Sequence, residues 1–296
     1  MRQGVPSPLD PCLRFPYNAS APKRDMLIDI RRRAGTIHTI TVSLAQIDVV
    51  WGCTETNLAR AEELATEAKS RGSDVIVFPE LWTTGYDLAR TRELAATHGH
   101  GVLARLSDMA RRHGLYVTGS VLKGAGSAVY NCMPLFAPTG EMLGDYDKIH
   151  LFGPMEEDRY LTAGDRTPVF DLPWGKTALA ICYDLRFPEL FRKYALSGVE
   201  TVFLCAEWPY PRLEHWRTLL RARAIENQCF LIACNRVGTA GGAHFFGHST
   251  IVNPWGECLL EGDESEALLT ATLDLGAVQE ARSKFPVLRD RRPAVY

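Results

Sequence analysis

A cysteine, a lysine and a glutamate each come directly after a stretch that is typical of a buried strand. Cys182 ends the apolar run Ala178–Cys182. Glu80 follows Asp74–Phe78, and Lys148 lies in the string YDKIHLFG. Side chains at strand ends line the crevices of α/β sheets, so the three can converge on one pocket. There the carboxylate would take the thiol proton and pass it to a leaving amine, while the ammonium would lower the pKa of the thiol and stabilise an oxyanion.

The segment around Cys182 predicts a sharp turn from a strand into a helix. Trp174-Gly175 precedes the strand, and Pro188 lies where a first helical turn tolerates proline. A thiol on such a turn lies near the partial positive charge of backbone N–H groups, which favours a nucleophilic thiolate. The competing interpretation is that Cys182 is a small buried hydrophobe, while Glu80 and Lys148 are solvated rim residues.

The elements that must position these residues alternate between strands and helices, interrupted by hairpins. This order predicts an α/β fold with mixed sheets, in one domain that has no linker between Ile37 and Leu275. The predicted strands are 36–47, 74–78, 115–121, 129–137, 141–150, 178–182, 200–205, 229–235, 248–253, 257–260 and 267–273. The predicted helices are 54–71, 101–113, 188–197 and 212–227.

Composition excludes several classes of protein. The chain has 296 residues and a formal charge of −2, which gives no reason to expect nucleic acid or a membrane as a partner. Its eight cysteines are scattered and form no CxxC pair, which argues against a disulfide framework and a zinc site and predicts the cytoplasm. Residues 1–35 carry five prolines and the basic cluster Arg31–Arg33, and predict a weakly ordered extension.

Three strings resemble the catalytic motifs of the nitrilase-like carbon–nitrogen hydrolases, in that family's order. They are FPELWTTGY around Glu80, YDKIHLF around Lys148 and ICYDLRFPEL around Cys182. The resemblance extends over nearly all of 37–296, including RARAIEN at 221–227 and the closing DRRP. The stretch AEWPYPRLEHWRTLLRARAIENQ is most similar to the branch of bacterial omega-amidases.

The resemblance implies a four-layer α-β-β-α sandwich of two mixed sheets, formed by residues 36–296, and a Glu–Lys–Cys triad. Glu80 would be the general base, Lys148 the oxyanion stabiliser and Cys182 the nucleophile. The backbone N–H of Tyr183 would be a second oxyanion donor. A further glutamate of the family, which positions the substrate or the lysine, aligns with Glu157 better than with the adjacent residue 156.

Three more residues are candidates for substrate binding or support. Arg186 can bind a substrate carboxylate through a bidentate contact, or pair with Glu189 or Glu226 to fix the turn. Glu207 and Trp208 follow the predicted strand 200–205, so both can face the pocket, although core packing also explains a buried tryptophan.

The expected activity is therefore hydrolysis of a small linear amide through a Cys thioester, without metal or cofactor. The omega-amide of a 2-oxo acid is the leading substrate. The alternatives are another amidase of the superfamily, acting on a deaminated-glutathione-type or N-carbamoyl substrate, and a non-catalytic scaffold of the same fold. The resemblance also implies a homodimer or higher homo-oligomer, paired through helices 188–197 and 212–227.

Overall fold

The computed structural model describes residues 39–295, and of residues 96–100 it describes only the backbone. The predicted extension, residues 1–35, lies outside the described residues. None of the helices in 39–295 is both long and apolar enough to cross a membrane.

The first sheet is mixed and has the strand order β15-β1-β2-β3-β5-β4, with β6 also paired to β5. The neighbours β1, β2 and β3 run parallel, whereas the other pairs are antiparallel. The strands are β1 Thr39–Gln46, β2 Val75–Val77, β3 Tyr116–Thr118, β4 Val121–Ala125, β5 Ala128–Phe136, β6 Met142–Asp147 and β15 Ala267–Asp274.

The second sheet is also mixed, with the order β14-β13-β10-β9-β8-β7 and a parallel centre formed by β8, β9 and β10. Every residue of β9 and β10 is buried, as expected for strands covered on both faces. The strands are β7 Val169–Leu172, β8 Gly175–Ile181, β9 Thr201–Ala206, β10 Phe230–Asn235, β13 Thr250–Val252 and β14 Cys258–Glu261; β11 Val237–Ala240 and β12 Ala243–Phe246 form a separate hairpin.

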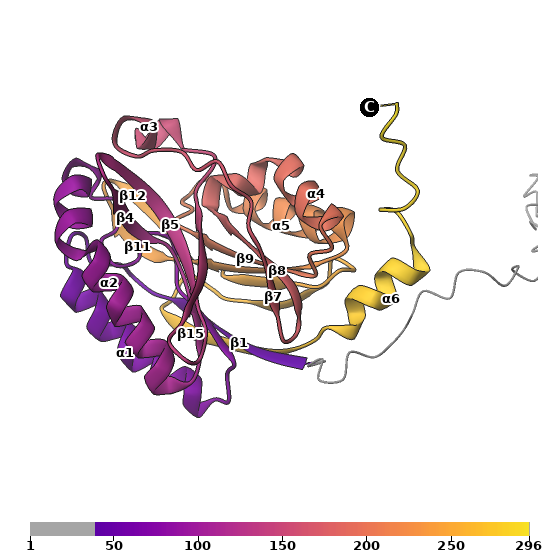
Figure 1. Ribbon diagram of the computed structural model, residues 1–296, viewed down its shortest axis with the longest axis horizontal. Coiled ribbons are helices and arrows are strands. Elements are labelled where there is room, and N and C mark those ends of the chain that lie inside the picture. The colour runs from indigo at the N-terminus through magenta and orange to yellow at the C-terminus, as the bar shows by residue number, and fades with distance from the viewer. Residues whose placement is uncertain (1–38, 296) are drawn as a thin grey trace, which may run out of the picture. The chain divides into compact units, whose positions relative to one another are not determined.

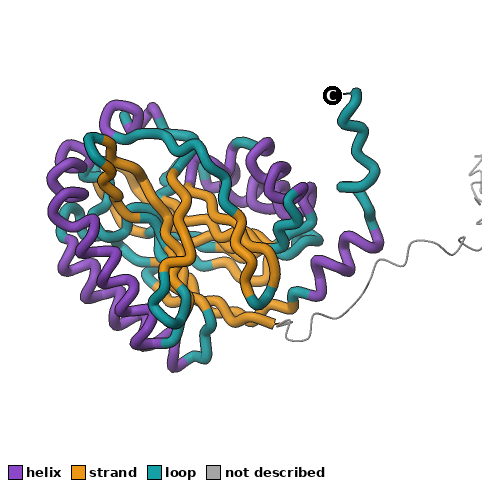
Figure 2. The backbone as a smooth tube through the Cα atoms, in the orientation of Figure 1, coloured by secondary structure: helices purple, strands orange, loops and turns teal. Residues whose placement is uncertain are grey.

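Successive side chains along the strands of the first sheet point to opposite faces, so the core is divided into two layers. In β2, Val75 and Val77 face the second sheet, while Ile76 packs on the other face against the helices α1 Thr54–Ser70 and α2 Thr91–His113. The helices α4 Pro188–Leu196 and α5 Leu213–Asn227 cover the outer face of the second sheet (Figures 1 and 2). The predicted α-β-β-α sandwich is confirmed. The short α3 Glu157–Tyr160 and the C-terminal α6 Gly276–Lys284 complete the helices of residues 39–295.

Two predicted elements have different bounds. Helix α2 begins at Thr91 rather than at residue 101, so it contains Gly99 and Gly101. Glycine has a low helix propensity, and tertiary context overrides it here. The predicted strand 115–121 is broken into β3 and β4. The break falls at Gly119, which has a φ of 147° and lies so close to Phe78 that an added Cβ would be 2.6 Å from the Cβ of Phe78.

Candidate active site

Cys182 lies on a sharp turn at the end of β8, as the sequence predicts. Its φ is 45°, in the left-handed region that non-glycine residues rarely occupy, and the turn continues as a short 3-10 helix before Pro188 opens α4. The buried carboxylate of Asp184 holds the turn. It accepts hydrogen bonds from the backbone N–H of Ile181 at 2.9 Å and from the hydroxyl of Tyr146 at 2.7 Å.

Glu80, three residues beyond β2, is fully buried and accepts four hydrogen bonds. Oε1 accepts from Tyr86 Oη at 2.7 Å, from Asn131 Nδ2 at 2.8 Å and from Lys148 Nζ at 2.8 Å, while Oε2 accepts from the backbone N–H of Glu207 at 2.9 Å. Burial by itself raises the pKa of Glu80, but Lys148 and the other donors outweigh burial and lower it. The carboxylate is therefore ionised at neutral pH.

Lys148, the residue after β6, is fully buried between two carboxylates. Its Nζ lies 2.8 Å from Glu80 Oε1 and 2.7 Å from Glu157 Oε1. Burial lowers the pKa of Lys148, but the two negative charges outweigh it and raise the pKa well above its ordinary value. Glu157 also accepts the backbone N–H of Phe152 at 2.7 Å, whereas Glu156 is exposed and pairs with Arg159. Of the two adjacent glutamates, the structure brings Glu157 to Lys148.

Lys148 lowers the pKa of the Cys182 thiol, as expected, but it does not set the net direction of the shift. Burial is the largest influence and raises this pKa, the charge of Glu80 raises it further, and Lys148 only partly opposes them. The net direction is well above the ordinary value, so Cys182 is a neutral thiol at rest. An ionised Glu80 beside a neutral thiol is a base poised to accept that proton.

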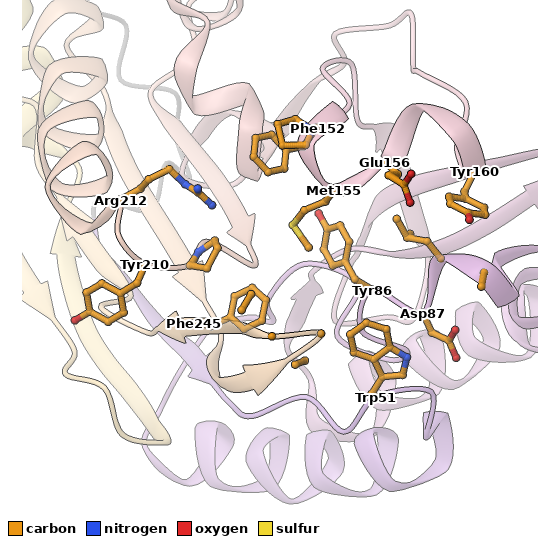
Figure 3. Close-up of a pocket in the computed structure, with 18 residues that line it drawn as sticks. Trp51, Tyr86, Asp87, Phe152, Met155, Glu156, Tyr160, Tyr210, Arg212 and Phe245 are labelled. Atoms are coloured by element: carbon orange, nitrogen blue, oxygen red, sulfur yellow. The ribbon is translucent and has the colours of Figure 1, made fainter.

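Cys182 opens into a small inner chamber that adjoins a larger outer cavity. The inner chamber has a free volume of about 20 Å³, close to what one water molecule needs, and the outer cavity measures about 730 Å³. The two share the side chains of Tyr86, Phe152, Met155 and Arg212, which Figure 3 shows around the outer cavity.

Two arginines line the inner chamber, and neither has an acidic partner among the described residues. Arg186 stacks on Trp208, with its guanidinium carbon 4.8 Å from the ring centroid, and its Nη2 lies 3.3 Å from His215 Nδ1. The pairing of Arg186 with Glu189 or Glu226 is not observed, and Glu226 is bound by Arg223. Burial, followed by the nearby charge of Arg212, lowers the pKa of Arg186. Within residues 39–295 neither Arg186 nor Arg212 forms an ion pair, which leaves both available to an anion.

The remaining predicted residues also lie at this chamber. Trp208 is 3% exposed, and its Nε1 donates to the carbonyl oxygen of Arg212 at 3.2 Å, so it packs in the core and supports Arg186 as well. The ring of Tyr183 packs against Phe152 with centroids 4.9 Å apart. Glu207 is 1% exposed, and its Oε2 accepts from Arg236 Nη1 at 3.2 Å.

The sequence reasoning missed several residues that the structure places at the site. Tyr86 ends the string FPELWTTGY, so it lies within a recognisable signal, and its hydroxyl bonds both Glu80 and Glu157. Asn131 and Arg236 carry no signal of this kind: Asn131 reaches Glu80 from β5, and Arg236, just after β10, reaches Glu207. Arg212 lies in the omega-amidase-like string but had no predicted role.

One cluster in residues 39–295 has the side-chain types of a metal site. It consists of Cys132, Asp145 and Asp147. The ammonium of Lys123 lies 2.7 Å from each of the two aspartates and already supplies their positive charge. Burial raises the pKa of the Cys132 thiol well above its ordinary value, which disfavours the thiolate that a metal would need. The donor set therefore fits an ion-pair network.

A buried thiol on a strained turn, beside an ionised carboxylate and an ammonium between two mixed sheets, is an arrangement that can carry out thiol-dependent hydrolysis. The sequence profile of the carbon–nitrogen hydrolases matches residues 41–283. A 2-oxoglutaramate amidase of Bacillus subtilis (strain 168) is 44% identical over 257 residues, which cover 86% of this chain and 99% of that protein. The chain belongs to the carbon–nitrogen hydrolase family of the nitrilase superfamily, and it is an amidase that acts on amides other than peptides.

Two solved structures extend the similarity to three dimensions. A CN-hydrolase superfamily protein of Xanthomonas campestris, with an arsenic adduct in its active site, superposes with a TM-score of 0.80 at 30% identity and covers 86% of this chain and 98% of that one. A glutamate-to-glutamine variant of a Nesterenkonia sp. AN1 amidase carries the acetamide moiety of fluoroacetamide on its active-site cysteine. It superposes with a TM-score of 0.79 at 26% identity, covering 88% and 96% of the two chains.

Proposed function

We propose that the chain is an omega-amidase that hydrolyses the terminal amide of a 2-oxo dicarboxylic acid, such as 2-oxoglutaramate, through a thioester on Cys182. The observation that carries the chemistry is the buried contact of Glu80 with Lys148 beside the Cys182 thiol. The 44% identity to a 2-oxoglutaramate amidase supports the choice of substrate.

The first half of the reaction transfers the acyl group to sulfur. Glu80 accepts the thiol proton as Sγ of Cys182 attacks the amide carbon. Lys148 and the backbone N–H of Tyr183 stabilise the negative charge that develops on the amide oxygen. When the C–N bond breaks, Glu80 returns the proton to the leaving nitrogen, and ammonia departs.

The second half hydrolyses the thioester. Glu80 takes a proton from a water molecule, whose oxygen attacks the thioester carbon, and the C–S bond breaks. The proton on Glu80 restores the thiol, and the carboxylate product leaves. Glu157 and Tyr86 act as positioning residues, because they hold Lys148 and Glu80 through the contacts described above.

Replacing the nucleophile tests the assignment. Cys182→Ala removes the attacking sulfur, so ammonia release from 2-oxoglutaramate should fall to background while the thermal unfolding midpoint stays within a few degrees of wild type. Cys182→Ser should also be very slow, because a hydroxyl ionises far less readily than a thiol. A Cys182→Ala protein that still releases ammonia would exclude the thioester mechanism and favour a different site or a scaffold role.

The two unpaired arginines support a substrate with a negative charge at the end away from the amide. With the amide at Cys182, the acyl chain would extend toward Arg186 and Arg212 at the border of the outer cavity. A bidentate Arg–carboxylate contact is a charge-assisted bond that contributes about 1.5–3 kcal/mol.

Arg186→Ala should therefore lower kcat/KM for 2-oxoglutaramate by about 10- to 100-fold, mostly through KM. The matched control is butyramide, a neutral amide on which the same variant should keep its rate within about threefold. An equal loss on both amides would contradict carboxylate binding, and turnover of N-carbamoyl amines alone would favour the second amidase class.

We also propose a homodimer in a reducing compartment, the cytoplasm. All seven cysteines of residues 39–295 are free, which supports that compartment. Of the apolar positions on α4 and α5, Leu190, Phe191, Tyr194 and Leu220 are buried in the core. Ile225, by contrast, is 52% exposed and supports a subunit contact on α5.

A further inference from the structure

Glu207 stands out because one of its oxygens is buried without a hydrogen-bond partner in the described part of the chain. The residue directly follows β9, is 1% exposed and lines the inner chamber together with Cys182. Its Oε2 is held by Arg236, which in turn bonds Asp48, whereas Oε1 has no partner among the described residues. A buried polar atom without a partner costs about 1–3 kcal/mol, so its presence at a substrate chamber points to a partner supplied by the ligand.

The charges around Glu207 favour the neutral acid. Glu80, whose Oε2 accepts the backbone N–H of Glu207, is an ionised neighbour, and only Arg236 is directly paired with the Glu207 carboxyl among the described residues. Burial, the largest influence, raises the pKa of Glu207, Arg236 opposes it, and Glu80 adds to it, giving a pKa of about 8. Because Oε2 accepts from Arg236, the proton of the neutral acid lies on Oε1. The free oxygen is then a hydrogen-bond donor.

The substrate must therefore offer an acceptor that the rest of the site leaves unbound. Under the proposed function, the amide oxygen is bound by Lys148 and the Tyr183 N–H, and the amide nitrogen only donates toward Glu80. The terminal carboxylate is matched by Arg186 and Arg212. The oxygen that remains in the omega-amide of a 2-oxo acid is the 2-oxo oxygen.

We propose that Glu207 is a specificity-determining residue that, as a neutral carboxylic acid, donates a hydrogen bond from Oε1 to the 2-oxo oxygen of the substrate. This inference rests on the proposed function and adds the reason why an oxo group is preferred. A site built around a buried donor discriminates strongly against an analogue that lacks the acceptor, because the donor is then left unpaired.

The test compares two substrates and two variants. The substrates are 2-oxoglutaramate and glutaramate, which has the same length, amide and carboxylate but no 2-oxo oxygen. Glu207→Met keeps the side-chain length without hydrogen bonding, and Glu207→Gln keeps a donor for the substrate and an acceptor for Arg236. Glu207→Met should reduce the kcat/KM preference for 2-oxoglutaramate over glutaramate by about 10- to 100-fold, whereas Glu207→Gln should keep it within about fivefold.

The pH dependence of the same preference provides a second readout that does not require Glu207→Met to fold. As pH rises through about 8, Glu207 loses the proton that it donates, so the wild-type preference for 2-oxoglutaramate should fall. In Glu207→Gln the preference should not change across this range. All the other titratable and charged groups near Glu207 are retained in Glu207→Gln. They are Glu80, Lys148, Cys182, the Arg236–Asp48 pair, and Tyr86, Tyr183, Arg186 and Arg212 of the inner chamber.

The outcomes distinguish a failure of the Glu207 inference from a failure of the omega-amidase proposal. The donor role of Glu207 would be overturned if Glu207→Met lost kcat/KM equally on both substrates. It would also be overturned if the wild-type preference did not change with pH up to about 9. Either result would leave the omega-amidase proposal standing. A wild-type enzyme that hydrolyses glutaramate but not 2-oxoglutaramate would overturn both. Selective loss in Glu207→Met, with rescue in Glu207→Gln, is the supporting result.

Discussion

Tyr86 connects the two carboxylates that hold Lys148. Its hydroxyl contacts Glu80 Oε1 and Glu157 Oε1, and Lys148 Nζ lies 3.4 Å from it. The hydrogen bond from Tyr86 is one of the interactions that lower the pKa of Glu80. Because Glu80 must be ionised to act as a base, activity is lost as pH falls through that pKa. Tyr86 therefore extends the working range toward acid pH.

Tyr86→Phe should raise the pKa of Glu80 and move the acid limb of the kcat/KM profile to higher pH. The ratio of kcat/KM at pH 5 to that at pH 7.5 should fall by up to about 10-fold, the equivalent of one hydrogen bond to a charged group. Tyr130→Phe is the control and should leave the profile unchanged, because Tyr130 of β5 lines neither the inner chamber nor the outer cavity and its ring lies under Lys123. An unshifted acid limb in Tyr86→Phe would show that Tyr86 does not tune Glu80.

At the scale of elements, the site is assembled from strand ends that turn sharply. Positive φ angles occur at Leu81, directly after Glu80, at Glu156, directly before Glu157, and at Cys182 itself. Such backbone conformations persist only where surrounding contacts hold them, and they cluster at functional sites. These three turns direct Glu80, Glu157 and Cys182 into one buried cluster around Lys148.

The end of β6 is held by a glycine from another segment. The N–H of Gly164 donates to the carbonyl oxygen of Lys148 at 2.8 Å, and a Cβ on Gly164 would lie 2.2 Å from the carbonyl oxygen of Asp147. Gly164→Ala should displace the backbone that carries Lys148, destabilise the fold by about 1–3 kcal/mol and lower kcat at least about 10-fold.

The matched control is Gly101→Ala, in the interior of α2, where an added Cβ meets nothing within 4 Å. There the same substitution should stabilise the protein by about 0.5–1 kcal/mol without affecting kcat. Thermal unfolding and ammonia-release kinetics on both variants provide the comparison. Wild-type kcat in Gly164→Ala would mean that Lys148 does not depend on this close approach.

At the scale of the whole molecule, an exposed apolar patch joins α5 to the C-terminal segment. It consists of Ile225, Trp255 and Phe285. Ile225 packs over Gly256, the neighbour of Trp255, and the rings of Trp255 and Phe285 are 5.8 Å apart. Ile225 and Phe285 are 52% and 58% exposed, and contiguous exposed apolar side chains are typical of protein–protein contact sites.

Sedimentation of the wild type should therefore give a species of twice the 33.0 kDa chain mass. Ile225→Glu introduces a charge at the centre of the patch and should shift the protein toward monomer, since an unpaired charge is costly in an interface. Thr66→Lys, on the exposed face of α1, should leave the mass unchanged. A wild type that sediments only as a monomer would exclude the dimer.

The sequence by itself determined the fold class and the positions of the three residues that we propose as catalytic. Strand periodicity, turn residues and the motifs around Glu80, Lys148 and Cys182 are local features, so they can be recognised without the fold. The structure confirms the two mixed sheets between helices, and it places these three residues just beyond β2, β6 and β8.

Only the tertiary structure decided the protonation states and the partners of these groups. Glu80 and Lys148 come from the first sheet and Cys182 from the second, so the thiol comes under the influence of their charges only after the sheets pack. Burial then raises the pKa of the Cys182 thiol against the influence of Lys148, and it leaves Glu207 with one unpaired oxygen. Desolvation and pairing depend on neighbours that are distant in the chain, which is why Asn131 and Arg236 emerged only from the fold.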